Sequence, residues 1–226
     1  MKTLLPLALL LLSACSAGPA ALRRGTDVYP DFSAMRAAYT EGSDYSREVY
    51  PRGSAVSVFA MHGGDIEDTT ARLARRIAGK NFNLYVFSGW LGRDSFRMHV
   101  TATHFDDPDA VLLATSSVLG ISVHAEADSG ARVCIGGANS RAAGLVARRL
   151  QEAGFAAETP CERLPGTSPR NLVNLPSAGG VQLELTLRLL RRLESDGEAL
   201  ASFSGAVRMA AAEFISSEGK STGDNK

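Results

Sequence analysis

Residues 55–79 read AVSVFAMHGGDIEDTTARLARRIAG, and this stretch indicates the fold class. Residues 55–61 are apolar and β-rich, so they predict a buried strand that ends at a His-Gly-Gly turn. Residues 66–78 carry apolar side chains at helical spacing and are followed by glycine, which predicts a helix. The segment therefore predicts a strand, a turn and a helix, with His62 ending the strand and Glu67 near the start of the helix.

The same alternation of short strands and longer helices continues in both directions along the chain. We expect further strands over 83–87, 97–101, 120–123, 132–135, 156–159 and 180–185. We expect further helices over 31–39, 107–117, 139–153, from the last strand to 194, and 207–215. This order predicts an α/β three-layer sandwich, with a mixed, largely parallel sheet and helices on both faces. In such folds, ligands bind at the carboxyl ends of the strands.

The composition is that of one ordinary globular domain. The chain has 226 residues, 24 basic against 24 acidic, and 45% of its residues are apolar. A nucleic-acid-binding protein would carry a basic excess, so we expect no nucleic-acid partner.

The N-terminus has the form of an export signal. A lysine at position 2 precedes an apolar run over 4–12, which is too short for a permanent membrane span. The following Leu12-Ser13-Ala14-Cys15 resembles a bacterial lipobox, which implies cleavage before Cys15 and lipidation of its thiol. The alternative is an ordinary signal peptide cleaved a few residues later. The lipobox reading predicts a lipid-anchored protein of the bacterial envelope, at the outer membrane and facing the periplasm.

Two cysteines, Cys134 and Cys161, remain in the exported domain. An oxidising compartment favours a disulfide between them. The alternative is a pair of buried free thiols.

Two histidines and a carboxylate stand at predicted strand ends. His62 and His124 each end a strand, and Glu67 follows His62 across the glycine turn. Two histidines with one carboxylate form a ligand set of catalytic zinc sites, which leave one position open for water. The alternatives are turn histidines bonded to backbone, and a first-turn carboxylate stabilised by the helix dipole.

Glu184 lies within the apolar strand VQLEL, where alternation puts Gln182 and Glu184 on one face. A buried carboxylate needs a role or a partner. From the pattern alone, Glu184 is either a general base or an ion-paired structural residue.

Five short segments occur in an order that resembles the poly-gamma-glutamate hydrolase family, whose members are also labelled phage-related replication proteins. They are HGGDIE (62–67), MHVTATHFDDP (98–108), SVH (122–124), GGAN (136–139) and GVQLE (180–184). The resemblance covers residues 29–193 and implies a zinc carboxypeptidase-like fold. It implies a zinc ion bound by His62, Glu67 and His124. It also implies that Glu184 acts as general base and then as general acid.

The substrate of such an enzyme carries carboxylates, which basic and amide side chains can bind. The candidates near these segments are Arg97, His104, Arg132, Asn139 and Arg141. Each has a plainer interpretation: surface charge for the arginines, a loop hydrogen bond for His104 and a helix N-cap for Asn139. His99 is expected in mid-strand, as a buried core histidine.

Together these features predict a monomeric, zinc-dependent amidohydrolase anchored to the envelope by lipid. The expected organisation is a signal peptide over 1–14, a lipidated cysteine and tether over 15–26, a zinc amidohydrolase domain over 27–217 and a polar tail over 218–226. The substrate is an anionic gamma-glutamyl polymer or a cell-wall peptide. The alternatives are a cell-wall amidase or carboxypeptidase, and a non-catalytic envelope-binding lipoprotein.

Overall fold

The structure, a computed structural model, describes residues 27–221. The expected signal peptide, Cys15 with its tether, and residues 222–226 of the polar tail lie outside the described residues. The described chain forms one seven-stranded sheet in the order β1-β3-β2-β4-β7-β5-β6. The strands are β1 (Tyr45–Tyr50), β2 (Val56–Gly64), β3 (Asn83–Gly89), β4 (Leu119–Glu126), β5 (Arg132–Gly136), β6 (Ala156–Glu158) and β7 (Gly180–Thr186).

The sheet is mixed and largely parallel, as the sequence predicted. Strands β2 and β3, β2 and β4, β4 and β7, and β5 and β6 pair in parallel. The pairs β1–β3 and β5–β7 are antiparallel. The central strands are buried on both faces, which explains why they read as nearly continuous apolar runs.

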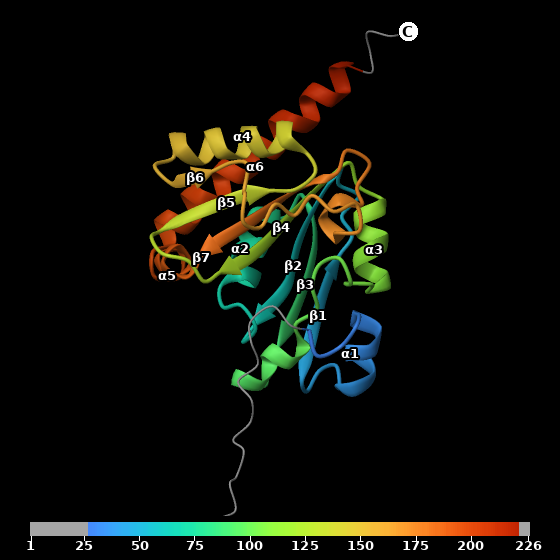
Figure 1. The fold of residues 1–226 in the computed structure, drawn as a ribbon. Helices are drawn as coiled ribbons and strands as arrows, with labels where there is room; N and C mark the ends of the chain where they lie inside the picture. The colour runs from blue at the N-terminus through green and yellow to red at the C-terminus, as the bar shows by residue number, and fades with distance from the viewer. Residues whose placement is uncertain (1–26, 222–226) are drawn as a thin grey trace, which may run out of the picture.

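Helices cover both faces of the sheet, so the molecule has three layers (Figure 1). One core contains side chains of α2 (Thr70–Ala78), α4 (Ser140–Glu152), α5 (Leu187–Ser195) and α6 (Gly197–Ser221). The other contains side chains of α1 (Phe32–Ala38), α3 (Pro108–Thr115) and the 3-10 helices η1 (Gly92–Met98) and η2 (Leu172–Asn174). The expected three-layer α/β sandwich is confirmed.

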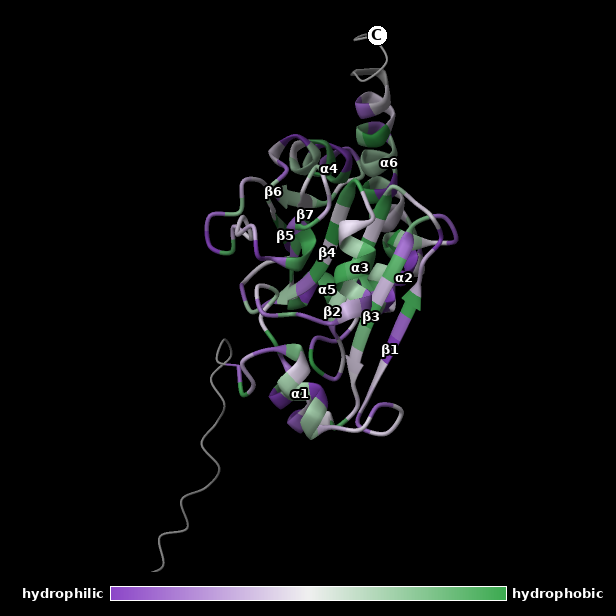
Figure 2. Cartoon of the chain, turned by 90° about the vertical axis from the view of Figure 1, so that its right-hand side faces the viewer, coloured by the Kyte–Doolittle hydropathy of each residue, from purple (hydrophilic) through white to green (hydrophobic). Residues whose placement is uncertain are grey.

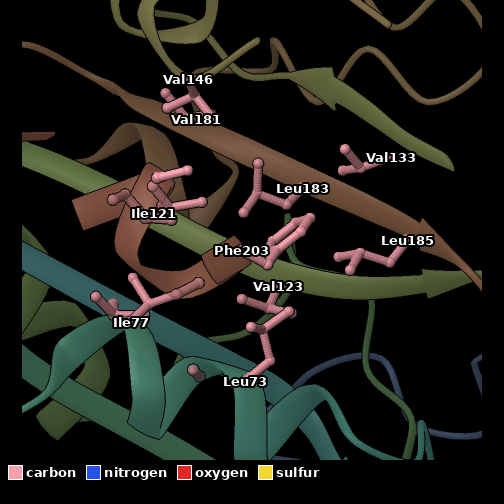
Figure 3. Packing of buried hydrophobic residues seen from close by; sticks show 14 of the residues in the cluster. Leu73, Ile77, Ile121, Val123, Val133, Val146, Val181, Leu183, Leu185 and Phe203 are labelled. Carbon is pink, nitrogen blue, oxygen red and sulfur yellow. The ribbon is translucent and has the colours of Figure 1, made fainter. Parts of the chain in front are cut away.

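The period-two alternation of the central strands decides which side chains face the site. Ile121 and Val123 of β4 and Leu183 of β7 join the first core, where they pack near Phe203 of α6 (Figure 3). The residues between them therefore point to the opposite face of the sheet. His124 and Glu184 lie on that face, and they pair directly across β4 and β7.

Several predicted boundaries are wrong in ways that bear on the site. Residues 97–101 form no strand, because η1 runs to Met98 and the chain then continues as a loop. The helix predicted from residue 66 begins at Thr70, so Glu67 lies in the preceding turn. The last helix runs on to Ser221, through part of the expected polar tail.

The sequence also gave no sign of the edge strand β1. Its side chains alternate weakly and several are hydrophilic (Figure 2). The strand is held instead by antiparallel pairing with β3, from Tyr45 opposite Gly89 to Tyr50 opposite Leu84. An edge strand of this kind is solvated on one side and carries a mixed pattern.

Two further findings concern the envelope hypothesis. The predicted disulfide between Cys134 and Cys161 is present, with an S–S distance of 2.03 Å. It joins β5 to the loop that follows β6. Within residues 27–221, none of the helices combines the length and apolarity needed to cross a bilayer.

Candidate active site and metal centre

A cavity of about 970 Å³ opens on the face of the sheet opposite the α2/α6 core. The four side chains singled out for catalysis all line it: His62, Glu67, His124 and Glu184. They come from β2, the turn after it, β4 and β7, which are neighbouring parallel strands. The cavity thus lies at the carboxyl ends of these strands, as expected for this fold class.

The turn after β2 brings Glu67 back toward His62. The backbone N–H of Glu67 donates to the carbonyl of His62 over 2.7 Å. The Glu67 carbonyl in turn accepts from the hydroxyl of Thr70, the first residue of α2, over 2.7 Å. The intervening Gly63 is packed so closely that a Cβ there would lie 2.8 Å from the Cβ of Ala71. The glycine turn therefore fixes the spacing between the two polar side chains.

Three donor atoms converge in the cavity. The Nδ1 atoms of His62 and His124 are 3.2 Å apart, and Nδ1 of His62 is 3.2 Å from Oε1 of Glu67. Nδ1 of His124 lies 3.9 Å from Oε2 of Glu67. Both histidines are at least 95% buried. These distances put two imidazole nitrogens and a carboxylate around one small volume.

The hydrogen bonds of His62 show why this arrangement suits a cation. Nε2 of His62 donates to the carbonyl of Val100 over 3.0 Å, so Nδ1 of a neutral ring presents a lone pair toward Glu67 and His124. Burial opposes protonation of His62, but the charge and hydrogen bond of Glu67 outweigh burial and raise its pKa. A proton can bridge one pair of these atoms, whereas a divalent cation would bind Nδ1 of His62, Nδ1 of His124 and the Glu67 carboxylate at once.

The protonation state of His124 is the one that a metal ligand requires. Burial, with the charges of neighbouring histidines, lowers the pKa of His124 to about 3 despite the opposing charge of Glu67. The imidazole is therefore neutral near pH 7, as a ligand must be. Its Nε2 atom is buried, and none of the residues that the structure describes bonds to it. The residues present fit a zinc ion in ligand type, burial and convergence.

Glu184 is held by a chain of amide hydrogen bonds. Nε2 of Gln182 donates to Oε1 of Glu184 over 2.8 Å, and Nδ2 of Asn171 donates to Oε1 of Gln182 over 2.8 Å. Burial raises the pKa of Glu184 well above its usual range, and the charges of Glu67 and Glu126 add to this effect. A raised carboxyl pKa brings proton uptake and release closer to neutral pH, which suits a general base.

His99 lies beside the same donor atoms. Its predicted place in mid-strand is wrong, because it follows η1 in a loop. Its Nδ1 atom is 2.8 Å from Oδ1 of Asp27, and its ring stacks on that of His62 with centroids 4.0 Å apart. Oδ2 of Asp27 accepts from the backbone N–H of Thr101 over 2.8 Å. The donor atoms of His62, Glu67 and His99 all lie within 4.8 Å of one another. His99 could therefore position His62 or add a ligand.

The residues proposed to bind substrate lie elsewhere. Asn139 caps α4, where its side chain accepts from the N–H of Ala142 over 2.8 Å. Arg132 pairs with Asp128 and Glu158. None of the described residues that line the cavity is one of the five candidates, which are Arg97, His104, Arg132, Asn139 and Arg141. Arg97, His104 and Arg141 are exposed.

Sequence reasoning missed two groups that lie at the cavity or beside it. Arg163 lines the cavity from the loop after β6. Asp27, the first residue that the structure describes, forms a hydrogen bond with His99. Neither lies in a periodic pattern. The disulfide was the available signal for Arg163, because Cys161 is two residues away and ties this loop to β5.

The chain is similar to known proteins in sequence and in fold. The profile of a family described as poly-gamma-glutamate hydrolase matches residues 29–202. The UPF0714 protein YndL of Bacillus subtilis (strain 168) is 35% identical over 164 residues, which are 71% of this chain and 64% of YndL. The chain thus spans slightly less than two thirds of that relative's length.

Two solved structures have the same fold. A bacteriophage poly-gamma-glutamate hydrolase superposes with a TM-score of 0.80 and 32% identity, over 84% of this chain and 99% of the other. A zinc-free, apo form of YndL superposes with a TM-score of 0.77 and 28% identity, over 83% and 98% of the two chains.

Proposed function

The chain belongs to the poly-gamma-glutamate hydrolase family, and we propose that it hydrolyses gamma-glutamyl amide bonds with a zinc ion as cofactor. The observation that carries the proposal is the convergence of His62, Glu67, His124 and Glu184 in one cavity. The similar YndL structure is an apo, zinc-free form, and this mention of zinc also supports zinc as the cofactor.

His62, Glu67 and His124 would hold the ion. When bound, zinc supplies a Lewis acid that polarises a carbonyl group and eases deprotonation of water near neutral pH. The chain's own contribution is to orient both imidazoles and to keep that of His124 neutral. The Val100 carbonyl fixes the proton of His62 on Nε2, and burial keeps His124 unprotonated.

Glu184 would move the proton. Its carboxylate takes a proton from the attacking water and delivers it to the nitrogen of the leaving amine, so that the amide C–N bond breaks to give a carboxylic acid and an amine. Gln182 holds one oxygen of this carboxylate, which leaves the other to face the reacting atoms. The raised pKa of Glu184 allows the same group to accept and release the proton.

A cell-wall peptide is the second candidate substrate, and the charge of the cavity favours it. Five carboxylates line the cavity: Asp65, Glu67, Asp68, Glu126 and Glu184. Among the described lining residues, Arg163 is the one arginine or lysine. A long polyanion with one carboxylate on every residue would be repelled along such walls, whereas a short gamma-glutamyl peptide brings fewer charges.

The test is product analysis by mass spectrometry. Zinc-loaded protein is incubated with poly-gamma-glutamate and, separately, with muropeptides that contain a gamma-glutamyl bond, beside the variant Glu184→Gln. We expect cleavage at gamma-glutamyl bonds in at least one of the two, lost in the variant. Cleavage of neither by a protein that retains zinc would contradict the proposed activity.

We also propose that the mature protein begins at a lipidated Cys15 and is anchored at the outer membrane, facing the periplasm. The Leu12-Ser13-Ala14-Cys15 tetrapeptide supports this. Metabolic labelling with a fatty acid, compared with Cys15→Ser, tests it. Equal labelling of both proteins would contradict the anchor.

A further inference from the structure

Arg163 differs from the other lining residues in charge and in how it is held. It lies two residues after Cys161, whose disulfide ties the loop to β5. The backbone N–H of Cys161 donates to the carbonyl of Ile135 over 3.0 Å, and that of Gly137 donates to the carbonyl of Pro165 over 2.8 Å. The main chain is thus fixed to β5 on both sides of Arg163.

Two carboxylates orient the guanidinium. Nη2 of Arg163 lies 2.6 Å from Oε2 of Glu126 and 2.7 Å from Oδ2 of Asp128. Both contacts use Nη2, and among the hydrogen bonds of the described residues Arg163 donates from this nitrogen alone, which leaves Nη1 to donate to a further acceptor. The Arg163 side chain is 48% exposed, although it lines the cavity. An arginine held in this way is preorganised to donate a charge-assisted hydrogen bond from Nη1 to a carboxylate.

The contact between Arg163 and Glu126 differs from a surface ion pair, because Glu126 is buried. Its side chain is buried, and within residues 27–219 no group bonds to its Oε1 atom. A buried carboxylate that is incompletely paired is unfavourable for stability alone, and such features mark functional sites. Here Glu126, together with Asp128, fixes Arg163 in place.

The spacing of His124 and Glu126 along β4 is of the same order as the length of the proposed substrate group. Glu126 follows His124 by two residues on β4, so both side chains point to the cavity about 6–7 Å apart along the strand. In a gamma-glutamyl group, four carbon–carbon bonds separate the reacting carbonyl carbon from the free α-carboxylate carbon, roughly 5 Å when extended. A carbonyl placed at the metal ligands would therefore present its α-carboxylate near Arg163.

We propose that Arg163 binds the free α-carboxylate of the gamma-glutamyl residue on the acyl side of the scissile bond, and so selects gamma-linked over ordinary peptides. The proposal rests on the proposed function. It assigns a specificity-determining contact to a residue outside the metal centre. A neutral α-carboxamide cannot replace the carboxylate, because it would leave the guanidinium with an imperfect partner.

The test compares two ligands that differ only in this group. They are gamma-glutamylglutamate with a free α-carboxylate on its first residue, and the same compound with an α-carboxamide there. Binding is measured by calorimetry on the zinc-loaded, full-length Glu184→Gln protein, which separates recognition from turnover. We expect the carboxylate ligand to bind roughly 10- to 100-fold more tightly. Adding Arg163→Gln should remove this preference.

Two further variants serve as controls. Arg132 shares the Asp128 partner but does not line the cavity, so Arg132→Gln should keep the preference. If Arg163→Gln alone destabilises the fold by leaving Glu126 unpaired, the pair Arg163→Gln with Glu126→Gln removes both charges and gives the same readout.

The outcomes separate the two proposals. Equal binding of both ligands, binding of neither, or a preference that survives without Arg163 would overturn the assignment. The Glu184→Gln protein could prefer the carboxylate ligand through Arg163 while the unchanged protein cleaves no gamma-glutamyl bond. That result would support the Arg163 site and count against the proposed activity.

Discussion

Cys134 on β5 lies directly opposite Glu184 on β7 in antiparallel register. The disulfide from Cys134 to Cys161 therefore starts at the position of the sheet that carries the general-base candidate. From there it fixes the loop that bears Arg163. The covalent link and the candidate general base thus occupy paired positions of the sheet, so the stability of the fold and the geometry of the site are connected at this point.

Replacement of both cysteines by alanine should lower the free energy of unfolding by about 3–4 kcal/mol, because the bond closes a loop of 27 positions. Urea unfolding monitored by circular dichroism measures this. The zinc content should stay unchanged while kcat/KM falls, since the loop forms one wall of the cavity. Unchanged activity would show that the loop keeps its position without the bond.

Glu184→Gln should abolish turnover and raise stability at neutral pH. The folded-state pKa of Glu184 is raised, chiefly by burial. A raised carboxyl pKa contributes stability at low pH, below the unfolded value, and that contribution is lost as the pH rises through the folded value. The variant's thermal midpoint should therefore exceed the wild-type value at pH 7–8, by about 2–4 °C for each kcal/mol, and approach it at pH 4. Equal midpoints at both pH values would contradict this.

Gln182→Leu should shift the acidic limb of the pH–rate profile toward higher pH. The Gln182 amide donates to Glu184 and stabilises its charged form, so its loss raises the pKa of Glu184 further. The shift is measured in kcat/KM over pH 5–9. A variant with lower activity but an unmoved acidic limb would assign Gln182 a purely packing role.

Purified protein supplied with zinc should hold about one ion per chain, and His124→Ala should lose it. His104→Ala is the matched control, because His104 is exposed and lies outside the lining residues. Binding should weaken as the pH is lowered, since the charge and hydrogen bond of Glu67 outweigh burial and raise the pKa of His62, so that protons compete with the metal. Elemental analysis and chelator competition at two pH values check both points. A pH-independent affinity would exclude His62 as a ligand.

Gly63→Ala should disturb the metal ligands through the backbone. A Cβ at Gly63 would lie 2.7 Å from Oγ of Ser88 and 2.8 Å from the Phe87 carbonyl, so the end of β2 must move. We expect the free energy of unfolding to fall by about 1–3 kcal/mol and zinc to bind more weakly. Gly144→Ala in α4 is the control, because no atom lies within 4 Å of its Cβ position. That change should be neutral or stabilise the helix by about 0.5–1 kcal/mol. Similar losses in both variants would contradict the turn's role.

The sequence alone determined the fold class and the four central side chains of the site. Alternation along β4 and β7 is a local property, and it separates Ile121 and Val123 from His124 without knowledge of the partner strands. The same period puts Glu184 on the face away from Leu183. Because parallel neighbouring strands end at one edge of the sheet, residues at these positions meet in space whatever path the loops take.

Only the tertiary structure decided what surrounds these four residues. Arg163, Asp27 and His99 reach the site through irregular segments whose course depends on the disulfide, on the close packing of loop against strand and on contacts with distant residues. No periodicity marks such segments, so nearness in sequence selected Arg132 and Asn139, which the structure uses for an ion pair and a helix cap. The regular elements are encoded by local patterns, whereas the loop side chains that would recognise a substrate depend on long-range packing.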